Sequence, residues 1–227
     1  MSINKNDNNF QNLSNDFVVV GGVLTNYLGN EREVIIPNGV IAVGACAFKG
    51  NLRIENVTFP SSLTKIENNA FEGCANLKRI HNPQSVIFYG DEAFKSSGLL
   101  YVSIGDRVEH IGAYCFANMP NLETITYMPG KNIRLKKSFA HCPLLSEVEM
   151  DRYYFFPSMR TFLDVRNNPN NQRPTFSDAF AGTPFIKKIF SKYMASYKKG
   201  ICLECGGKVR KGLFHARCKS CKLDYKN

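Results

Sequence analysis

The sequence predicts a repeat solenoid, mainly of β-structure, with a parallel sheet on one face, followed by an amphipathic helix and a small metal-binding module. Three observations lead to this class. Apolar residues recur with a period of about 23 positions, each period holds a short alternating run, and the C-terminal region carries two CxxC pairs. The 227 residues suffice for one sizeable core and a small extra module.

The chain begins with a polar, asparagine-rich stretch, MSINKNDNNFQNLSND. It lacks the apolar centre of a signal peptide, and nowhere does the chain hold the ~18 consecutive apolar residues of a membrane span. We therefore expect a disordered tail over residues 1–16 and a cytoplasmic protein.

Three columns of apolar residues define the repeat over residues 17–185. The first column is a phenylalanine after a small residue: Phe48, Phe71, Phe94, Phe116, Phe139 and Phe180. The second is β-branched: Val34, Val57, Ile80, Val102, Ile125 and Val148. The third is Ile54, Leu77, Leu100, Leu122 and Leu145. One repeat cannot bury its apolar face alone, so we expect the units to stack, with the phenylalanines as an internal spine.

The alternation within each unit predicts short strands. In the run VII before Pro37, residues 34 and 36 point to one side and Ile35 to the other. The third unit has Asn82 where other units have an apolar residue, which we interpret as sequence drift.

The units EVIIPNGVIAVGACAFKG, NVTFPSSLTKIENNAFEGCANL and YVSIGDRVEHIGAYCFANMPNL resemble the BspA-like, or Treponema pallidum-type, leucine-rich repeats. The segment FVVVGGVLTNYLGNEREVIIP resembles the hairpin that often opens such arrays. The resemblance implies a curved solenoid with an N-terminal hairpin cap. It also implies a recognition or adhesion role, since the family's arrays are mostly surface or secreted modules.

The outward positions of the strands are the predicted binding surface. One outward column is Ile35, Thr58, His81, Ser103, Thr126 and Glu149, and Arg79 and Tyr101 flank it. The residues predicted to bind a partner are Thr58, Arg79, His81, Tyr101, Ser103 and Thr126, together with Tyr153 and Tyr154. For any single position, ordinary solvent exposure is the alternative.

Tyr153 and Tyr154 belong to an insertion. Met150 and Phe180 are 30 positions apart where Ile36 and Phe48 are 12 apart, so 18 residues are inserted, at about residues 151–176. Insertions in solenoids often bind partners. The simpler interpretation is that the inserted aromatic residues cover the open end of the stack.

A basic amphipathic helix is predicted over residues 186–199. Thr183 suits the N-cap and Pro184 the first helical position. Apolar residues then follow at helical spacing, with most lysines outside their stripe. Such a helix can lie on a membrane surface, but docking on the end of the core as a lid is the simpler expectation.

Residues 200–227 resemble a zinc ribbon. Cys202, Cys205, Cys218 and Cys221 form two CxxC pairs separated by 12 residues. Two such turns place four thiolates around one structural Zn²⁺ and leave no open position for catalysis. An iron site of the rubredoxin kind would use similar pairs. The other cysteines, Cys46, Cys74, Cys115 and Cys142, are expected to be reduced and buried.

The excess positive charge lies at the C-terminus. Residues 1–186 hold 17 basic and 17 acidic side chains, whereas residues 187–227 hold 12 basic and 2 acidic ones. Six basic residues surround the predicted metal site and suit nucleic-acid phosphates: Lys208, Arg210, Lys211, Arg217, Lys219 and Lys222. A solvated tail that aids solubility is the alternative.

The sequence predicts a protein that is not an enzyme, because it lacks the common phosphate-loop, metalloprotease, hydrolase and dinucleotide motifs. The predicted function is recognition or scaffolding, in which the solenoid binds a protein partner and the zinc ribbon is an appended structural module. Nucleic-acid binding through the basic C-terminal region is the alternative. A cell-surface adhesion role, with export by another route, is a weaker one.

Overall fold

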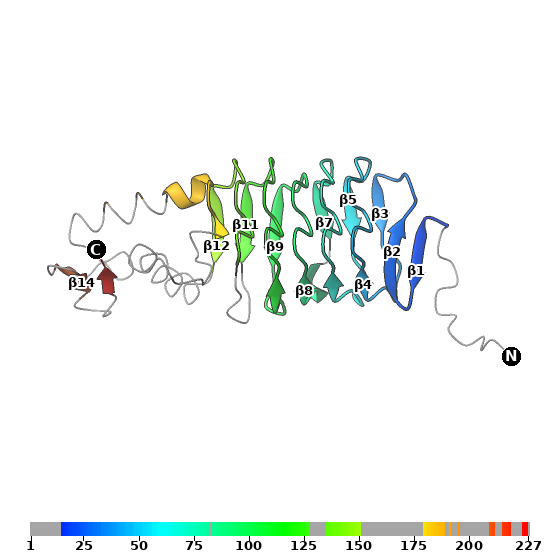
Figure 1. Cartoon of the computed structure of the whole chain (residues 1–227), viewed down its shortest axis with the longest axis horizontal. Coiled ribbons are helices and arrows are strands. Elements are labelled where there is room, and N and C mark those ends of the chain that lie inside the picture. Colours follow the sequence, from blue (N-terminus) through cyan, green and yellow to red (C-terminus); the bar gives the residue numbers. More distant parts are fainter. Residues whose placement is uncertain are drawn as a thin grey trace.

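The computed structural model describes residues 15–81, 83–127, 135–150 and 179–188, residues 191 and 195, and three strands at 209–211, 215–218 and 224–226. Figure 1 shows the strands of the repeat region lying side by side along the long axis of the molecule. The described repeats form a mainly-β parallel solenoid, as predicted.

A hairpin opens the solenoid, as the sequence indicates. Strands β1 (Phe17–Val20) and β2 (Val23–Tyr27) pair antiparallel, and Val20 faces Val23. Between them, Gly21 and Gly22 have φ of 57° and 78°, a conformation that glycine adopts without strain. The carbonyl of Asp16 accepts a hydrogen bond from the Leu28 N–H at 2.7 Å, so the folded region includes one residue of the predicted tail. Residues 1–14 lie outside the described part.

Parallel strands run along two faces of the solenoid, so the prediction of a sheet on one face was incomplete. The face that was predicted consists of β3 (Glu33–Ile35), β5 (Asn56–Thr58) and β7 (Arg79–His81), and then of β9 (Tyr101–Ile104), β11 (Thr124–Tyr127) and β12 (Glu147–Met150). We call it the sheet face.

The second sheet continues from the hairpin. After β1 and β2 come β4 (Ala42–Val43), β6 (Lys65–Ile66), β8 (Phe88–Tyr89) and β10 (His110–Ile111). Each of these four strands has two residues, which is too short for alternation to be visible in the sequence. In the view of Figure 1, β4 and β8 of this second sheet lie below β5, β7 and β9 of the sheet face.

The third side of each repeat is a tight turn with two left-handed residues. The first left-handed column has φ between 53° and 59° and consists of Cys46, Asn69, Glu92, Tyr114 and Lys137. The second column consists of Gly50, Gly73, Ser96, Asn118, His141 and Gly182. Backbone hydrogen bonds join these turns along the solenoid, as from Phe116 N–H to the Ser138 carbonyl at 2.7 Å.

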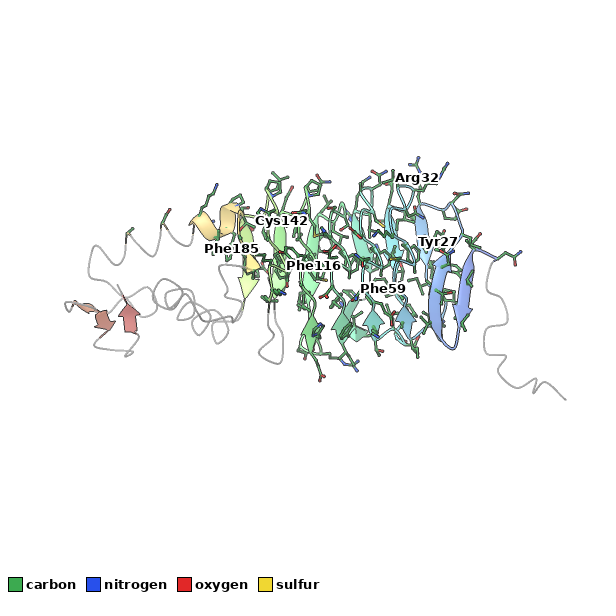
Figure 2. All side chains as sticks on the ribbon, in the orientation of Figure 1. Tyr27, Arg32, Phe59, Phe116, Cys142 and Phe185 are labelled. Carbon is green, nitrogen blue, oxygen red and sulfur yellow. The ribbon has the colours of Figure 1, made fainter. Side chains whose placement is uncertain are left out.

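The phenylalanine spine is present. From Phe48 to Phe180, neighbouring rings of the column have centroids 4.7–5.4 Å apart and planes within 11° of each other. Tyr27 stacks on Phe48 at one end, and Phe185 meets Phe180 edge-on at the other. Figure 2 labels three members of this column, Tyr27, Phe116 and Phe185.

The stack continues across the insertion. The N–H of Phe139 donates to the carbonyl of Ala179 at 2.8 Å, and that of His141 donates to the carbonyl of Ala181 at 2.7 Å. Phe180 therefore occupies the next position of the spine although it lies 41 residues beyond Phe139. The inserted segment itself, with Tyr153 and Tyr154, lies outside the described residues.

The first turn of a helix closes the C-terminal end of the core. Residues 184–188 are helical, so the helix starts at Pro184, as the cap residues predicted, and two residues before the range 186–199. The Thr183 hydroxyl accepts a hydrogen bond from the Ile186 N–H at 3.3 Å and donates one to the Phe180 carbonyl at 2.8 Å. Phe185 is only 4% exposed and packs on the spine. Beyond residue 188 only positions 191 and 195 are described, so the rest of the helix stays a prediction.

The third apolar column differs from expectation at one position. Leu99, not Leu100, belongs to the third apolar column, because Leu99 is fully buried and Leu100 only half-buried. The turn between Phe94 and Leu99 is one residue shorter than its equivalents, and Gly98 makes it possible, since a Cβ there would collide with the Ala75 carbonyl oxygen.

The four cysteines of the repeat region are free thiols, and three of them are buried. Cys46 is exposed, contrary to the prediction, because it occupies a left-handed position on the outside of a turn. Burial raises the pKa of the Cys74 thiol to about 12 and that of Cys142 to about 11. These thiols are therefore protonated side chains of the core.

Candidate functional site

The sheet face brings six of the eight predicted partner-binding residues together. Strand register places them in two rows on each half of the face. The outer rows are Ile35–Thr58–His81 and Ser103–Thr126–Glu149, and the flanking rows are Glu33–Asn56–Arg79 and Tyr101–Thr124–Glu147. The rows run across the strands, so side chains of successive repeats become neighbours. Tyr153 and Tyr154 lie outside the described residues.

The sheet face presents apolar and polar groups to solvent. Ile35 is 72% exposed and Tyr101 is 44% exposed. Thr58 and Thr126 are half-buried, and the Thr126 hydroxyl donates to a carboxylate oxygen of Glu149 at 3.3 Å. Such a mixture of exposed aromatic, aliphatic and hydroxyl groups is typical of protein-binding surfaces.

An ion-pair cluster borders the face just before β3, β5 and β7. Glu55 accepts from Arg32 at 3.1 Å and from Lys78 at 2.8 Å, so three successive repeats are linked. Lys78, and then Arg32, hold the pKa of the Glu55 carboxyl below its usual value. Because these groups are exposed, they contribute little to stability and mainly set the charge of the border.

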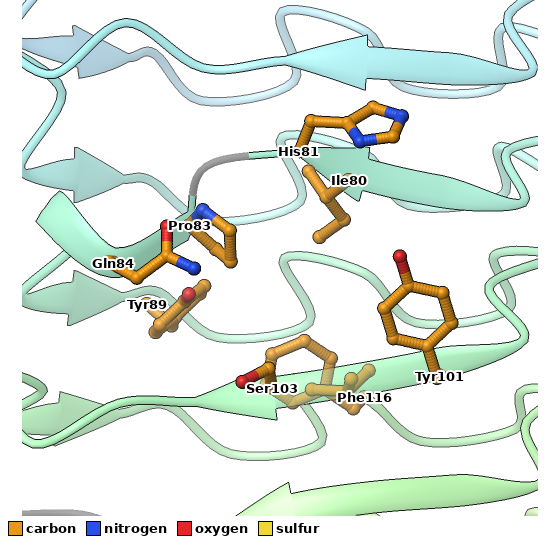
Figure 3. Close-up of a pocket in the computed structure, with 9 residues that line it drawn as sticks. Ile80, His81, Pro83, Gln84, Tyr89, Tyr101, Ser103 and Phe116 are labelled. Atoms are coloured by element: carbon orange, nitrogen blue, oxygen red, sulfur yellow. The ribbon is translucent and has the colours of Figure 1, made fainter.

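A cleft divides the sheet face between β7 and β9. A hydrogen bond of 3.2 Å from Leu100 N–H to the Lys78 carbonyl joins the two repeats at the start of these strands. Beyond it the strands are not paired, and the face consists of two separate three-stranded sheets. The 3₁₀ helix η1 (Pro83–Ser85) follows β7 here. The cleft has a volume of about 220 Å³ (Figure 3).

The cleft joins predicted and unpredicted residues. Its upper part includes His81, Tyr101 and Ser103, which the sequence indicated, and Gln84, which it did not. The deeper part includes Ile80, Tyr89, Val102 and Phe116. Burial raises the pKa of the Tyr89 phenol, so this hydroxyl is protonated. The sequence signal for the cleft was the polar residue at position 82 followed by Pro83, which we had interpreted as drift.

The C-terminal strands form a separate antiparallel sheet. They are β13 (Val209–Lys211), β14 (His215–Cys218) and β15 (Asp224–Lys226). Val209 faces Cys218, and Arg210 faces Arg217. The side chains of these strands are not described. Cys202, Cys205 and Cys221 lie outside the described residues, as do Lys208, Lys219 and Lys222.

Two general features also concern only the described part of the chain. It contains no helix with the length and apolarity needed to cross a bilayer. It also contains no group of three or more histidine, cysteine or acidic side chains placed to hold a metal ion.

Solved structures with similar folds come from several bacterial proteins. The Treponema pallidum leucine-rich repeat protein is 26% identical over 59% of this chain and 78% of its own, with a TM-score of 0.47. A leucine-rich repeat protein from Bacteroides ovatus is 23% identical over 56% of this chain and 41% of its own, with a TM-score of 0.40. The pneumococcal vaccine antigen PcpA is 19% identical over 59% of this chain and 35% of its own, with a TM-score of 0.46.

No curated protein matches the chain. Six copies of the BspA type leucine-rich repeat region match over residues 26–151. These residues are the repeats whose strands, turns and phenylalanine spine are described above, and they make up more than half of the 227 residues. The protein therefore belongs to the family of BspA type leucine-rich repeat proteins.

Proposed function

We propose that this protein is a non-enzymatic recognition module whose sheet face binds a protein partner. The observation that carries the proposal is the register of exposed side chains across β3, β5 and β7 and across β9, β11 and β12. Rows of this kind on a solenoid offer a broad surface made by many repeats, which suits an extended protein surface better than a small substrate.

The charge of the repeat region supports a protein partner rather than a polyanion. Basic and acidic residues are equal in number over residues 1–186. The sheet face carries both signs, with Arg79 on β7 and with Glu147 and Glu149 on β12. Mixed charges at a rim favour specificity toward a complementary protein surface.

The test is partner capture with matched variants. The full chain would be used as bait in extracts of its source cells, next to Thr58→Arg and Thr126→Arg, which place a bulky cation on the sheet face. Thr64→Arg is the control, because Thr64 is also half-buried but precedes β6 in the second sheet. We expect the same protein to be captured by the wild type and the control but not by the sheet-face variants. Equal capture of the partner by the wild type and all three variants would show that the sheet face is not the binding surface.

We propose further that residues 200–227 form a zinc ribbon that holds one structural Zn²⁺ through Cys202, Cys205, Cys218 and Cys221. The spacing of the two pairs supports this, and so does the antiparallel sheet that ends at Cys218, since a zinc ribbon holds its metal at the ends of such strands. The metal would contribute on the order of 10 kcal/mol to folding of this small module.

Metal analysis of protein purified under reducing conditions tests the ribbon. One zinc per chain is expected, and much less in Cys205→Ser, whereas Cys46→Ser should keep the metal because Cys46 lies on the solenoid. Iron in place of zinc would indicate a rubredoxin-like site. A chain that holds no metal and takes up none would exclude the ribbon.

Nucleic-acid binding is a second candidate, favoured by one observation. Arg210 and Arg217 are paired positions in the register of β13 and β14. Fluorescence anisotropy with labelled RNA and DNA over a salt series tests it. For duplex DNA, a plot of the logarithm of the binding constant against the logarithm of the salt concentration should have a slope of about −0.9 per phosphate contact. Binding that is lost in Arg210→Gln/Arg217→Gln but kept in Arg53→Gln would support this candidate, and no binding at low salt would exclude it.

A further inference from the structure

The cleft between β7 and β9 exposes two free strand edges. The carbonyl of His81 accepts a hydrogen bond from Phe59 N–H at 3.1 Å, so the peptide groups of His81 face β5. Successive peptide groups in a strand point to opposite sides, and those of Ile80 therefore face the cleft. On the other wall, the register of β9 with β11 turns the peptide groups of Val102 toward β11 and those of Ser103 toward the cleft. Both walls thus offer backbone donors and acceptors.

The floor of the cleft is apolar with one polar atom. Ile80 is half-buried, although the equivalent Val34, Val57 and Val102 are buried, because the cleft uncovers it. Tyr89 is 1% exposed and lines the cleft beside Phe116. The Tyr89 hydroxyl is the polar group that this residue brings to the cleft. An occupant with a hydrogen-bonding group can therefore gain a polar partner there as well as apolar contacts.

The rim adds an aromatic ring and an amide. Figure 3 shows the Tyr101 ring extending from β9 toward β7, with Gln84 on the other side of the cleft. The volume of about 220 Å³ is below the ~300–1,000 Å³ of sites for drug-sized ligands. The cleft therefore suits one inserted side chain better than a free cofactor. An aromatic body with a polar tip matches the apolar walls and the buried hydroxyl.

We propose that the cleft is the anchor pocket of the sheet face and receives one tyrosine side chain from an extended segment of the partner. The backbone of that segment hydrogen-bonds the free peptide groups of Ile80 and Ser103, as an added strand does at a sheet edge. The tyrosine hydroxyl pairs with that of Tyr89, and its ring lies against Tyr101 and Phe116. This inference rests on the proposed function, because it specifies the chemistry of the partner.

The test uses N-acetyl-L-tyrosine N-methylamide as the probe, with backbone amide NMR of the full chain as the readout. We expect concentration-dependent shifts of the Ile80, Tyr89, Tyr101 and Ser103 amides. Ile80→Phe, which fills the cleft, should weaken binding at least tenfold. Ile41→Phe is the matched control, because it makes the same change at an exposed position just before β4 of the second sheet, and it should leave binding unchanged.

A second comparison keeps the proposal testable if Ile80→Phe does not fold. The wild type should bind the tyrosine probe more tightly than N-acetyl-L-phenylalanine N-methylamide, and Tyr89→Phe should remove that preference. No shift of the cleft amides at 20 mM probe would overturn the proposal, as would binding that neither Ile80→Phe nor Tyr89→Phe changes. Stronger shifts with methyl β-glucoside would also overturn it and indicate a sugar site.

Failure of the proposed function would look different. Partner capture would then be unaffected by Thr58→Arg and Thr126→Arg, whatever the probe does in the cleft. Capture that depends on those variants, together with a silent probe, would keep the sheet face as the interface and reject only the tyrosine anchor.

Discussion

The phenylalanine spine predicts a measurable coupling between neighbouring rings. Phe94 and Phe116 are fully buried, with centroids 5.4 Å apart and planes 7° from parallel. Stacked pairs contribute about 0.5–1.5 kcal/mol beyond the area they bury. Phe116 also stacks on Phe139. Phe116→Leu keeps most of the apolar volume but removes both stacks, so we expect the free energy of unfolding to fall by about 1–3 kcal/mol.

A double-mutant cycle isolates the stacking from the packing. Urea unfolding followed by far-UV circular dichroism would compare Phe94→Leu, Phe116→Leu and the double variant. The double variant should lose about 0.5–1.5 kcal/mol less than the sum of the single variants. Phe48 and Phe116 form the control pair, because two other rings separate them, and their effects should add within about 0.5 kcal/mol. Equal coupling in both cycles would refute the stacking argument and leave the rings as space-filling groups.

Three further outcomes can be checked by similar means. Gly98→Ala should lower the free energy of unfolding by about 1–3 kcal/mol, because its Cβ meets the Ala75 carbonyl, whereas Gly105→Ala, with open space around it, should be near neutral in the same urea assay. Thr183→Ala should lower the free energy of unfolding by about 1–2 kcal/mol, because the helix loses its N-cap. Amide hydrogen exchange at Ile186 should become faster in this variant. The raised pKa values of Cys74 and Cys142 mean that their contribution to stability is complete below the unfolded thiol pKa of about 8.5. This contribution is lost as the pH rises toward the folded-state pKa values, about 11 for Cys142 and about 12 for Cys74. The free energy of unfolding of the wild type should therefore fall between pH 9 and 11, and it should fall less in Cys74→Ala, as urea unfolding at each pH would show.

The sequence predicted the features that repeat and missed those that break the repeat. The spine and the outward rows could be predicted because each position is sampled in every unit, so the register is visible without a structure. The second sheet was missed because strands such as Ala42–Val43 are too short to alternate. The regular spacing of the third apolar column points to Leu100, and Leu99 beside it is also a leucine. Only the shortened turn at Gly98 shows that Leu99 is the buried member of the column.

The candidate site was predicted in its upper half only. His81, Tyr101 and Ser103 point outward by alternation, which sequence alone reveals. Tyr89 comes from the opposite sheet, and its approach to the cleft depends on how far β7 and β9 separate. In the sequence, this repeat differs at position 82, where Asn82 stands in place of the apolar residue of other units. Single-sequence reasoning could not weigh such a change, because the proline also occurs in repeats that stay closed, as Pro37 and Pro60.

The junction between Met150 and Ala179 shows where this architecture tolerates growth. The chain from Phe139 to Phe180 has 41 residues where other units have 22 or 23, yet the next ring stacks at 5.2 Å. Closing the longer loop costs only about 0.5 kcal/mol more by polymer statistics, and each further doubling about 0.6 kcal/mol. An insertion of this length can therefore be accommodated at this point without disturbing the stack. At Gly98 even one added methyl group has no space.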